Sequence, residues 1–365
     1  MIDFFCSTNL MNASPMSPHA LDIPVVTDIH VAALTQRLQH VLDNKTKPVG
    51  ALGRLEALAL RIAGILGTAA PMLDQPQMLV CAADHGLASR GVSAYPSDVT
   101  WQMVANFLSG GAAVSVLARQ HGLALTVVDC GVRRDFEPRD GLMICKIANG
   151  TADASIGPAM SNTQCEQALA NGMKIVRDLP GNALLLGEMG IGNSSATAML
   201  LARLAGLDID ACTGPGTGLD APGLLHKRKV LREVLALHAA AITPLDALAA
   251  FGGFEIATLV GAVLQAAHER RVIVLDGFIA SVAVLVAQAL RPHVVQRCVA
   301  AHVSAEPGHA LLLKHIGLDA LLQLDLRLGE GSGAALAWPL LESACLVMRE
   351  MASFEAAGVS RQTGG

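Results

Sequence analysis

Two glutamates stand beside glycines, and each has a chemistry that its spacing allows. Glu330 lies between Gly329 and Gly331, so its carboxylate can approach a ligand without crowding. Partial removal from water would raise the proton affinity of this carboxylate and suit it to act as a general base. Glu330 is as well placed to begin a helix, where its charge would favour the helix dipole. The spacing favours neither interpretation over the other.

The second glutamate, Glu188, follows an apolar run and begins the sequence Glu-Met-Gly-Ile-Gly-Asn. A carboxylate between an apolar strand and glycines needs a polar partner, and ribose hydroxyls would be a suitable one. Asn193 or Ser194 is predicted to cap the helix that follows.

A glycine-rich segment, Thr213-Gly-Pro-Gly-Thr-Gly-Leu-Asp220, precedes a helical stretch that carries Lys227. Backbone N–H groups in such a turn can bind a phosphate, and the lysine adds a positive charge. A turn with no ligand is the commoner explanation for glycines at this spacing. The segment matches neither the Walker A pattern nor a Rossmann fingerprint.

The only tyrosine, Tyr95, lies close to Trp101, Gln102 and Met103. In a chain with 3% aromatic residues this grouping indicates a pocket for a flat apolar ligand, although core packing better explains Trp101 by itself.

The segment Ala-Ala-Asp-His-Gly, which contains Asp84 and His85, could indicate a metal site or an acid/base pair, but a loop held by hydrogen bonds from side chains to the backbone is the better explanation. His302 and His309 have no consistent carboxylate partner in the sequence, and adjacent carboxylates are absent from it. Metal catalysis is therefore not favoured.

Composition excludes other classes of function. The 26 basic and 31 acidic side chains give a net charge of -5 without a basic run, so no nucleic-acid partner is expected. The 8 cysteines show no zinc-site spacing, which predicts reduced thiols. The most apolar stretch, Val272 to Leu290, is interrupted by Asp276 and Gly277 and is too short to span a membrane. The N-terminus lacks a secretion signal, so a cytoplasmic location is expected.

The functional segments must be positioned by elements that the hydrophobic pattern predicts. Short apolar runs alternate with stretches of helical length, which is typical of a parallel sheet covered by helices on both faces. We expect strands at Met78 to Ala83, Ala124 to Asp129, Met143 to Ile147, Ala183 to Gly187, Val272 to Leu275, Arg297 to Val303 and Leu321 to Leu326. We expect helices at Leu52 to Leu66, Val99 to Gln120, Asn162 to Arg177, Ser194 to Ala205, Leu224 to Ala240, Phe254 to His268, Ile279 to Leu290 and Gly333 to Ala352.

Nearly every expected strand runs into a glycine-bearing or polar cluster, and in an open parallel sheet these clusters gather at the carboxyl edge, where ligands bind. Both chain ends read as helical. We expect residues 1–70 and 334–365 to form a small helical domain, with 1–25 a partly mobile lead-in, and residues 71–333 to form a large α/β substrate-binding domain.

Taken together, the chain resembles one family, the nicotinate-nucleotide:dimethylbenzimidazole phosphoribosyltransferases. Ten segments follow the order of that family over roughly residues 45 to 350: TKPVGALGRLE, CAADHG, GVSAYPSDVTWQM, GGAAVSVLARQ, GEMGIGNSSATA, TGPGTGLD, GGFEIATLVGAVL, VLDGFIAS, HVSAEPGH and LRLGEGSGAALA. The resemblance implies a Rossmann-like parallel sheet with a small helical domain from both ends, a homodimer, and no metal or redox cofactor. It also implies transfer of the 5-phosphoribosyl group of nicotinate mononucleotide to 5,6-dimethylbenzimidazole, which makes the lower ligand of cobalamin.

The resemblance further implies roles for individual residues, with Glu330 as the general base. The nucleotide and its ribose phosphate would be held by Glu188, Gly190, Gly192, Asn193, Thr213, Gly214, Gly216, Lys227, Asp276 and Ser304. The base pocket would be formed by Asp84, Ser93, Tyr95, Gln102, Met103, Met189 and Leu328. Two alternatives stay open: a transferase that uses the same donor with another base or a phenol, and a nucleotide sensor. The presence of both glutamates disfavours the sensor.

Overall fold

Six parallel strands form the centre of the structure, a computed structural model that describes residues 21–360. The lead-in predicted for residues 1–25 and the cysteine at position 6 therefore lie wholly or mostly outside the described residues. The strands run in the order β3-β2-β1-β4-β5-β6. Their bounds are β1 Gln77–Ala83, β2 Ala124–Gly131, β3 Leu142–Ile144, β4 Ala183–Met189, β5 Val272–Leu275 and β6 Cys298–Ala300. This arrangement confirms the predicted Rossmann-like α/β sheet.

The strand order places a crevice at the carboxyl edge of the sheet. From β1 the chain builds outward through β2 and β3, and it then returns to the other side of β1 to build β4, β5 and β6. The loops after β1 and β4 therefore leave in opposite directions, and ligands of doubly wound sheets bind at such a switch point. Glu188 is the last residue but one of β4, at this edge.

The alternation of side chains along β1 divides the core into two apolar clusters. Leu79, Cys81 and Ala83 belong to one cluster, and Met78 and Val80 belong to the other. Because successive side chains of a strand point to opposite faces, each face of the sheet needs its own cover of helices.

One face is covered chiefly by α5 (Asn162–Asp178), α6 (Asn193–Ala205), α10 (Phe254–His268) and α11 (Phe278–Leu290). The helices α5 and α10 approach closely because both carry a glycine at their contact. A Cβ atom at Gly172 would lie 1.9 Å from the Thr258 carbonyl oxygen. Close packing of this kind needs small residues on both helices.

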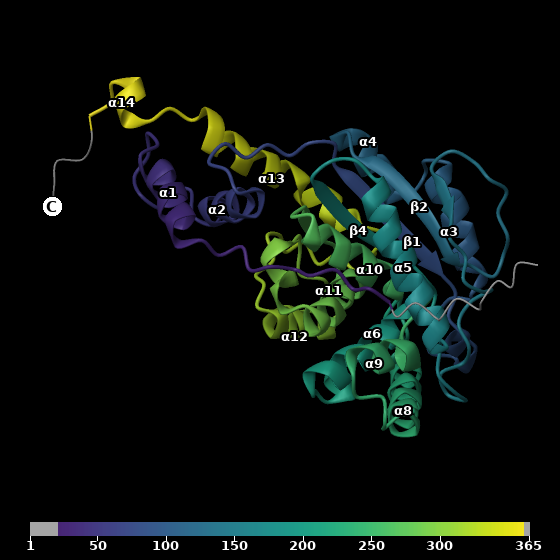
Figure 1. Ribbon diagram of the computed structural model, residues 1–365. Helices are drawn as coiled ribbons and strands as arrows, with labels where there is room; N and C mark the ends of the chain where they lie inside the picture. The colour runs from purple at the N-terminus through teal and green to yellow at the C-terminus, as the bar shows by residue number, and fades with distance from the viewer. Residues whose placement is uncertain (1–20, 361–365) are drawn as a thin grey trace, which may run out of the picture.

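The other face is covered by helices from both ends of the chain (Figure 1). Here α1 (Ala32–Asp43) packs on α2 (Arg54–Leu66), and α2 packs on α13 (Ser332–Glu350), which also contacts β4. The same cluster thus joins the terminal helices to the sheet, with Trp338 buried within it. The division into a small and a large domain stays a prediction.

The helix expected at Val99 to Gln120 is in fact two helices, α3 (Asp98–Leu108) and α4 (Ala113–His121). Gly110 has a φ of +78°, which interrupts the helical backbone between them. By length and composition alone, Asp98–His121 is the one stretch of residues 21–360 that is apolar enough to cross a membrane. It differs from the stretch that the sequence analysis singled out, which forms the buried β5 and α11.

Three strand predictions were wrong in extent or existence. Leu321 to Leu326 forms no strand, since only Leu322 makes a β-bridge, to His302, and Asp325 has a φ of +53°. The other two are the edge strands: β3 begins at Leu142 and already ends at Ile144, and β6 is shorter than expected at both ends. The remaining elements are η1 (Gly86–Arg90), α7 (Ile209–Cys212), α8 (Ala221–Leu237), α9 (Pro244–Phe251), η2 (Pro292–Arg297), α12 (Pro307–Ile316) and α14 (Phe354–Ala357).

Candidate active site

A cleft opens at the carboxyl ends of β4, β5 and β6. Its empty volume is about 690 Å³, a figure that includes the space open to solvent. Its wall is formed by Ser93, Glu188, Met189, Gly190, Ile191, Gly192, Asn193, Ser194, Gly216, Thr217, Gly277, Phe278, Ile279, His302, Ser304, Glu306, Arg327, Leu328 and Gly329.

Glu188 lines this cleft, and its carboxyl group is an unusually weak acid. Its side chain is buried, and Oε2 accepts a hydrogen bond from Nδ2 of Asn193. Burial, together with the negative charges of Asp276 and Glu255, raises the pKa of Glu188 to about 8. A carboxyl that is neutral near pH 7 both donates and accepts hydrogen bonds, which suits it to a ribose hydroxyl.

The capping role expected for Asn193 or Ser194 was wrong. The residue at the N-cap of α6 is Gly192, with a φ of +101°, and Asn193 is the first helical residue. Its amide turns back to Glu188 instead of binding the helix backbone. Gly192 can take this left-handed conformation because it has no Cβ atom.

Glu330 lies in a turn in which three successive residues have a positive φ. The angles are +80° at Gly329, +68° at Glu330 and +91° at Gly331. The turn packs on β4, where a Cβ atom at Gly187 would lie 2.3 Å from the Glu330 carbonyl oxygen. Gly329 forms part of the cleft wall. Glu330 is the next residue, and its side chain is buried.

The environment of Glu330 favours proton uptake. Burial, followed by the charge of Asp276, raises the pKa of Glu330 to about 7, although the backbone of Val114 stabilises the charged form. Oε2 of Glu330 has no hydrogen-bond partner among the described residues. A carboxylate with this pKa and a free acceptor atom has the properties of a general base near neutral pH.

Lys227 approaches the cleft from α8. Its side chain is buried, and Nζ donates to Oγ of Ser194 at 2.9 Å and to the carbonyl oxygen of Gly214 at 3.2 Å. Burial lowers the pKa of Lys227 to about 8, and the carboxylate of Glu306 acts in the opposite direction. The lysine thus connects the glycine-rich segment predicted to bind phosphate with the start of α6.

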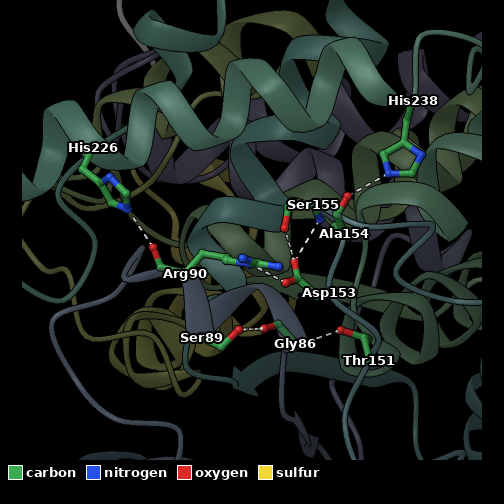
Figure 2. A network of polar contacts seen from close by, with 9 residues as sticks. All are labelled: Gly86, Ser89, Arg90, Thr151, Asp153, Ala154, Ser155, His226 and His238. Carbon is green, nitrogen blue, oxygen red and sulfur yellow. Dashed lines mark hydrogen bonds and ion pairs between the residues drawn. The ribbon is translucent and has the colours of Figure 1, made fainter.

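The segment that leads to Tyr95 is anchored to α8 next to Lys227. Figure 2 shows His226 donating a hydrogen bond from Nε2 to the carbonyl oxygen of Arg90, at 2.7 Å. The guanidinium of Arg90 pairs with Asp153, whose carboxylate also accepts from the backbone and hydroxyl of Ser155. This network fixes the end of η1, from which the chain runs into the cleft wall at Ser93.

The structure brings about half of the predicted site residues to the cleft wall. These are Glu188, Gly190, Gly192, Asn193, Gly216 and Ser304 of the nucleotide set, and Ser93, Met189 and Leu328 of the base-pocket set. Thr213, Gly214, Lys227, Asp276 and Glu330 lie outside the wall. So do Gln102, Met103, Tyr95, which is exposed, and Asp84, whose Oδ2 accepts from the backbone of Arg133.

Comparison with known proteins decides the family. A model of a phosphoribosyltransferase family matches residues 29–359. The chain belongs to this phosphoribosyltransferase family. It is 80% identical over 340 residues to the nicotinate-nucleotide–dimethylbenzimidazole phosphoribosyltransferase of Variovorax paradoxus, covering 93% of this chain and 97% of that protein.

More distant members of the family are similar along the same length. The protein of the same name from Cupriavidus necator is 55% identical, covering 93% of this chain and 99% of its own. The crystal structure of the Thermus thermophilus enzyme of this name superposes with a TM-score of 0.87 at 40% identity, covering 91% of this chain and all of that one. The family match thus includes both the sheet and the terminal helices.

Sequence reasoning missed several polar contacts in and around the candidate site. Glu255, on α10, pairs with His85 at 2.7 Å, and both side chains are buried. Although burial opposes its charged form, the carboxylate of Glu255 raises the pKa of His85. His302 does have a carboxylate neighbour, because its Nε2 lies 3.4 Å from Oδ1 of Asp276. Glu306 also lines the cleft, and its Oε2 has no hydrogen-bond partner within residues 21–360.

The thiols and potential metal ligands stay apart in the part of the chain that the structure describes. The seven cysteines between residues 21 and 360 are free thiols. Over the same residues, no three His, Cys, Asp or Glu side chains are grouped so that they could hold a metal ion.

Proposed function

We propose that this phosphoribosyltransferase moves the 5-phosphoribosyl group of nicotinate mononucleotide to 5,6-dimethylbenzimidazole, giving α-ribazole 5'-phosphate and nicotinate for the lower ligand of cobalamin. The relatives described above, which bear the name of this reaction, support the choice of substrates. The observation that carries the proposal is the meeting of Glu188 with the Gly329–Gly331 turn at the edge of one cleft.

The reaction needs one base and no general acid. Nicotinate mononucleotide carries a cationic pyridinium at C1 of the ribose, so nicotinate leaves without being protonated. Glu330 takes the N–H proton of the imidazole ring while the other ring nitrogen attacks C1 from the opposite face, which inverts the configuration. General-base catalysis contributes about 100- to 10,000-fold, and holding two substrates in place contributes ~7 kcal/mol or more.

The nucleotide would be held by groups on either side of the cleft. Lys227, with Ser194 and Gly216, provides a positive charge and donors for the phosphate. The neutral carboxyl of Glu188 would bind the ribose, and Ser304 lies on the same wall. Met189 and Leu328 offer apolar surface for the benzimidazole, and Ser93 offers a polar group beside it.

We further propose that the enzyme works as a homodimer in the cytoplasm, without a metal or redox cofactor. We also retain the proposed small domain from residues 1–70 and 334–365, which the contact between α2 and α13 supports.

The test is to mix the purified protein with nicotinate mononucleotide and one acceptor at a time, namely dimethylbenzimidazole, adenine or a phenol, and to separate the products by chromatography. We expect α-ribazole 5'-phosphate and nicotinate in equal amounts from dimethylbenzimidazole. Faster turnover of adenine or the phenol would favour the alternative acceptor. Binding of the nucleotide without any product would favour the sensor.

A further inference from the structure

Asp276 follows β5 and is almost fully buried, but it does not form part of the cleft wall. Both of its carboxylate oxygens accept hydrogen bonds from backbone N–H groups that follow Glu330 in the chain. Oδ2 accepts from the N–H of Gly331 at 3.1 Å, and Oδ1 accepts from the N–H of Gly333 at 2.6 Å and of Ala334 at 3.2 Å. A carboxylate so engaged has little capacity left for a ribose hydroxyl.

We propose that Asp276 is a positioning residue for Glu330: it fixes the 329–331 turn against the end of β5 and places its own charge beside the carboxylate of the base. This role differs from the nucleotide contact expected of Asp276. It rests on the proposed function of Glu330 as the general base.

The backbone conformation of the 329–331 turn must be stabilised by contacts from outside the turn. Positive φ angles are disfavoured for residues other than glycine, and Glu330 has a φ of +68° between two glycines that are also left-handed. The hydrogen bonds of Asp276 begin at the next residue, Gly331, and continue into the first turn of α13. They satisfy N–H groups that have no partner within the helix. The same bonds therefore cap α13 and hold the residue that precedes it.

His302 connects this arrangement to the cleft. Its Nε2 lies 3.4 Å from Oδ1 of Asp276, and its ring forms part of the cleft wall. His302 and Asp276 both pack against the backbone of Gly333. A Cβ atom at Gly333 would lie 2.1 Å from Cδ2 of His302 and 2.8 Å from Oδ1 of Asp276, so a side chain there would separate them. Asp276 thus lies between the turn that carries the base and the wall that faces the substrates.

The charge of Asp276 also acts on the base. After burial, Asp276 is the largest cause of the raised pKa of Glu330, and it raises the pKa of Glu188 as well. The other ionisable groups nearby are Glu188 at the end of β4, with Glu255 behind it on α10, and His302 after β6. From α4, the Glu330 carboxylate is faced by the backbone of Val114. Removing the negative charge of Asp276 would lower the pKa of Glu330, because the charged form of the base would lose a like-charged neighbour.

The test is the pH dependence of kcat in Asp276→Asn, with nicotinate mononucleotide and dimethylbenzimidazole both saturating. Activity should rise with pH as Glu330 loses its proton, and in the variant this rise should move to lower pH by about half a unit or more. The plateau of kcat should fall about tenfold or more, since the base is weaker and its turn is less firmly held, while KM for the nucleotide changes by less than about threefold. A large rise in KM with an unshifted pH profile would mean that Asp276 binds the ribose, and it would overturn the proposal.

Asp129→Asn is the matched control. Asp129 is another buried carboxylate near the end of a strand, and its Oδ1 accepts from the N–H groups of Gly131 and Val132. We expect this variant to lose thermal stability while its pH profile stays unchanged. Equal effects of the two variants on kcat, with neither profile shifted, would reduce Asp276 to a structural cap and contradict the proposal.

A second variant, Asp276→Glu, keeps the charge but displaces the carboxylate, and it provides a readout if Asp276→Asn does not fold. Its plateau should fall while its pH profile stays within about 0.3 units of the wild type. A shift of its pH profile toward low pH would refute the claim that the charge of Asp276 raises the pKa of Glu330. If Glu330→Gln retains wild-type turnover, the assigned base itself is wrong and the proposal fails with it; an inactive Glu330→Gln beside an unaffected Asp276→Asn refutes only the role of Asp276.

Discussion

Glu188 and Gly329 are in direct contact at the edge of the cleft: a Cβ atom on Gly329 would lie 2.5 Å from Oε1 of Glu188. Glu188 comes from the end of β4, and Gly329 comes from the segment that leads into α13. Since Glu330 is the next residue, the absence of a side chain at position 329 allows the turn that carries Glu330 to pack against Glu188. A side chain at position 329 would therefore displace either Glu188 or the turn.

The first prediction concerns Gly329→Ala, which should lower turnover about 100-fold or more because the methyl group displaces Glu188. Gly317→Ala is the control, since Gly317 has a similar φ of +72° but open space around its Cβ position. Both variants should lose roughly 1 kcal/mol of stability from the left-handed backbone. Turnover assays and thermal unfolding would measure this, and equal turnover in the two variants would contradict the role of the contact.

Glu330→Gln should lower kcat by about 100- to 10,000-fold, because an amide cannot accept the imidazole proton. The affinity for nicotinate mononucleotide should change little, since Glu330 is not among the residues that form the cleft wall. Calorimetric titration with the nucleotide, beside a chromatographic assay of product, separates these two quantities. Retention of wild-type turnover would remove Glu330 from the mechanism.

Lys227→Met should weaken binding of nicotinate mononucleotide about 10- to 100-fold, because a buried charge beside the phosphate site is lost. Lys229→Met is a matched control two residues along α8, where the lysine is exposed and pairs only with Glu233 at 4.0 Å. Calorimetric titration with nicotinate mononucleotide at two salt concentrations should show weaker binding for Lys227→Met and unchanged binding for Lys229→Met. Equal affinities for the two variants would exclude Lys227 from the phosphate site.

The substitution Glu188→Gln tests the raised pKa of Glu188 through its effect on stability. The folded pKa is about 8, above the ordinary value of 4.5, so the contribution of this group is fully present below pH 4.5 and is lost as the pH rises to about 8. The wild type should thus lose stability relative to the variant between pH 5 and 8, by at most about 1.4 kcal/mol per pH unit. Urea unfolding at both pH values measures the difference. Glu342→Gln, at an exposed position of α13, should show no such trend, and a flat difference for Glu188→Gln would refute the raised pKa.

Local patterns predicted the central elements well because burial on both faces leaves a continuous apolar signal. β5 and α10 have the predicted bounds, and β1 and β4 extend the predicted runs by one or two residues. The edge elements and the break at Gly110 were predicted less well, since short strands and paired glycines carry little periodicity.

The site was predictable where one segment of sequence contains the whole signal, as with the glycines beside Glu188 and Glu330. The pairs His85–Glu255 and His302–Asp276 were not, because their members lie far apart in the chain. Only the strand order brings the ends of β1, β5 and β6 and the start of α10 to one edge. No local spacing rule contains that information.

The position of α13 has a consequence for how the protein is made. The proposed base stands just ahead of the last long helix, and that helix packs on α2, from the opposite end of the chain, and on β4. During translation, the loops proposed to bind the nucleotide therefore leave the ribosome well before α13 can hold the 329–331 turn against the sheet. A chain that ends before α13 would hold most of the cleft wall but would lack the bonds from Gly333 and Ala334 to Asp276, so we expect it to be inactive.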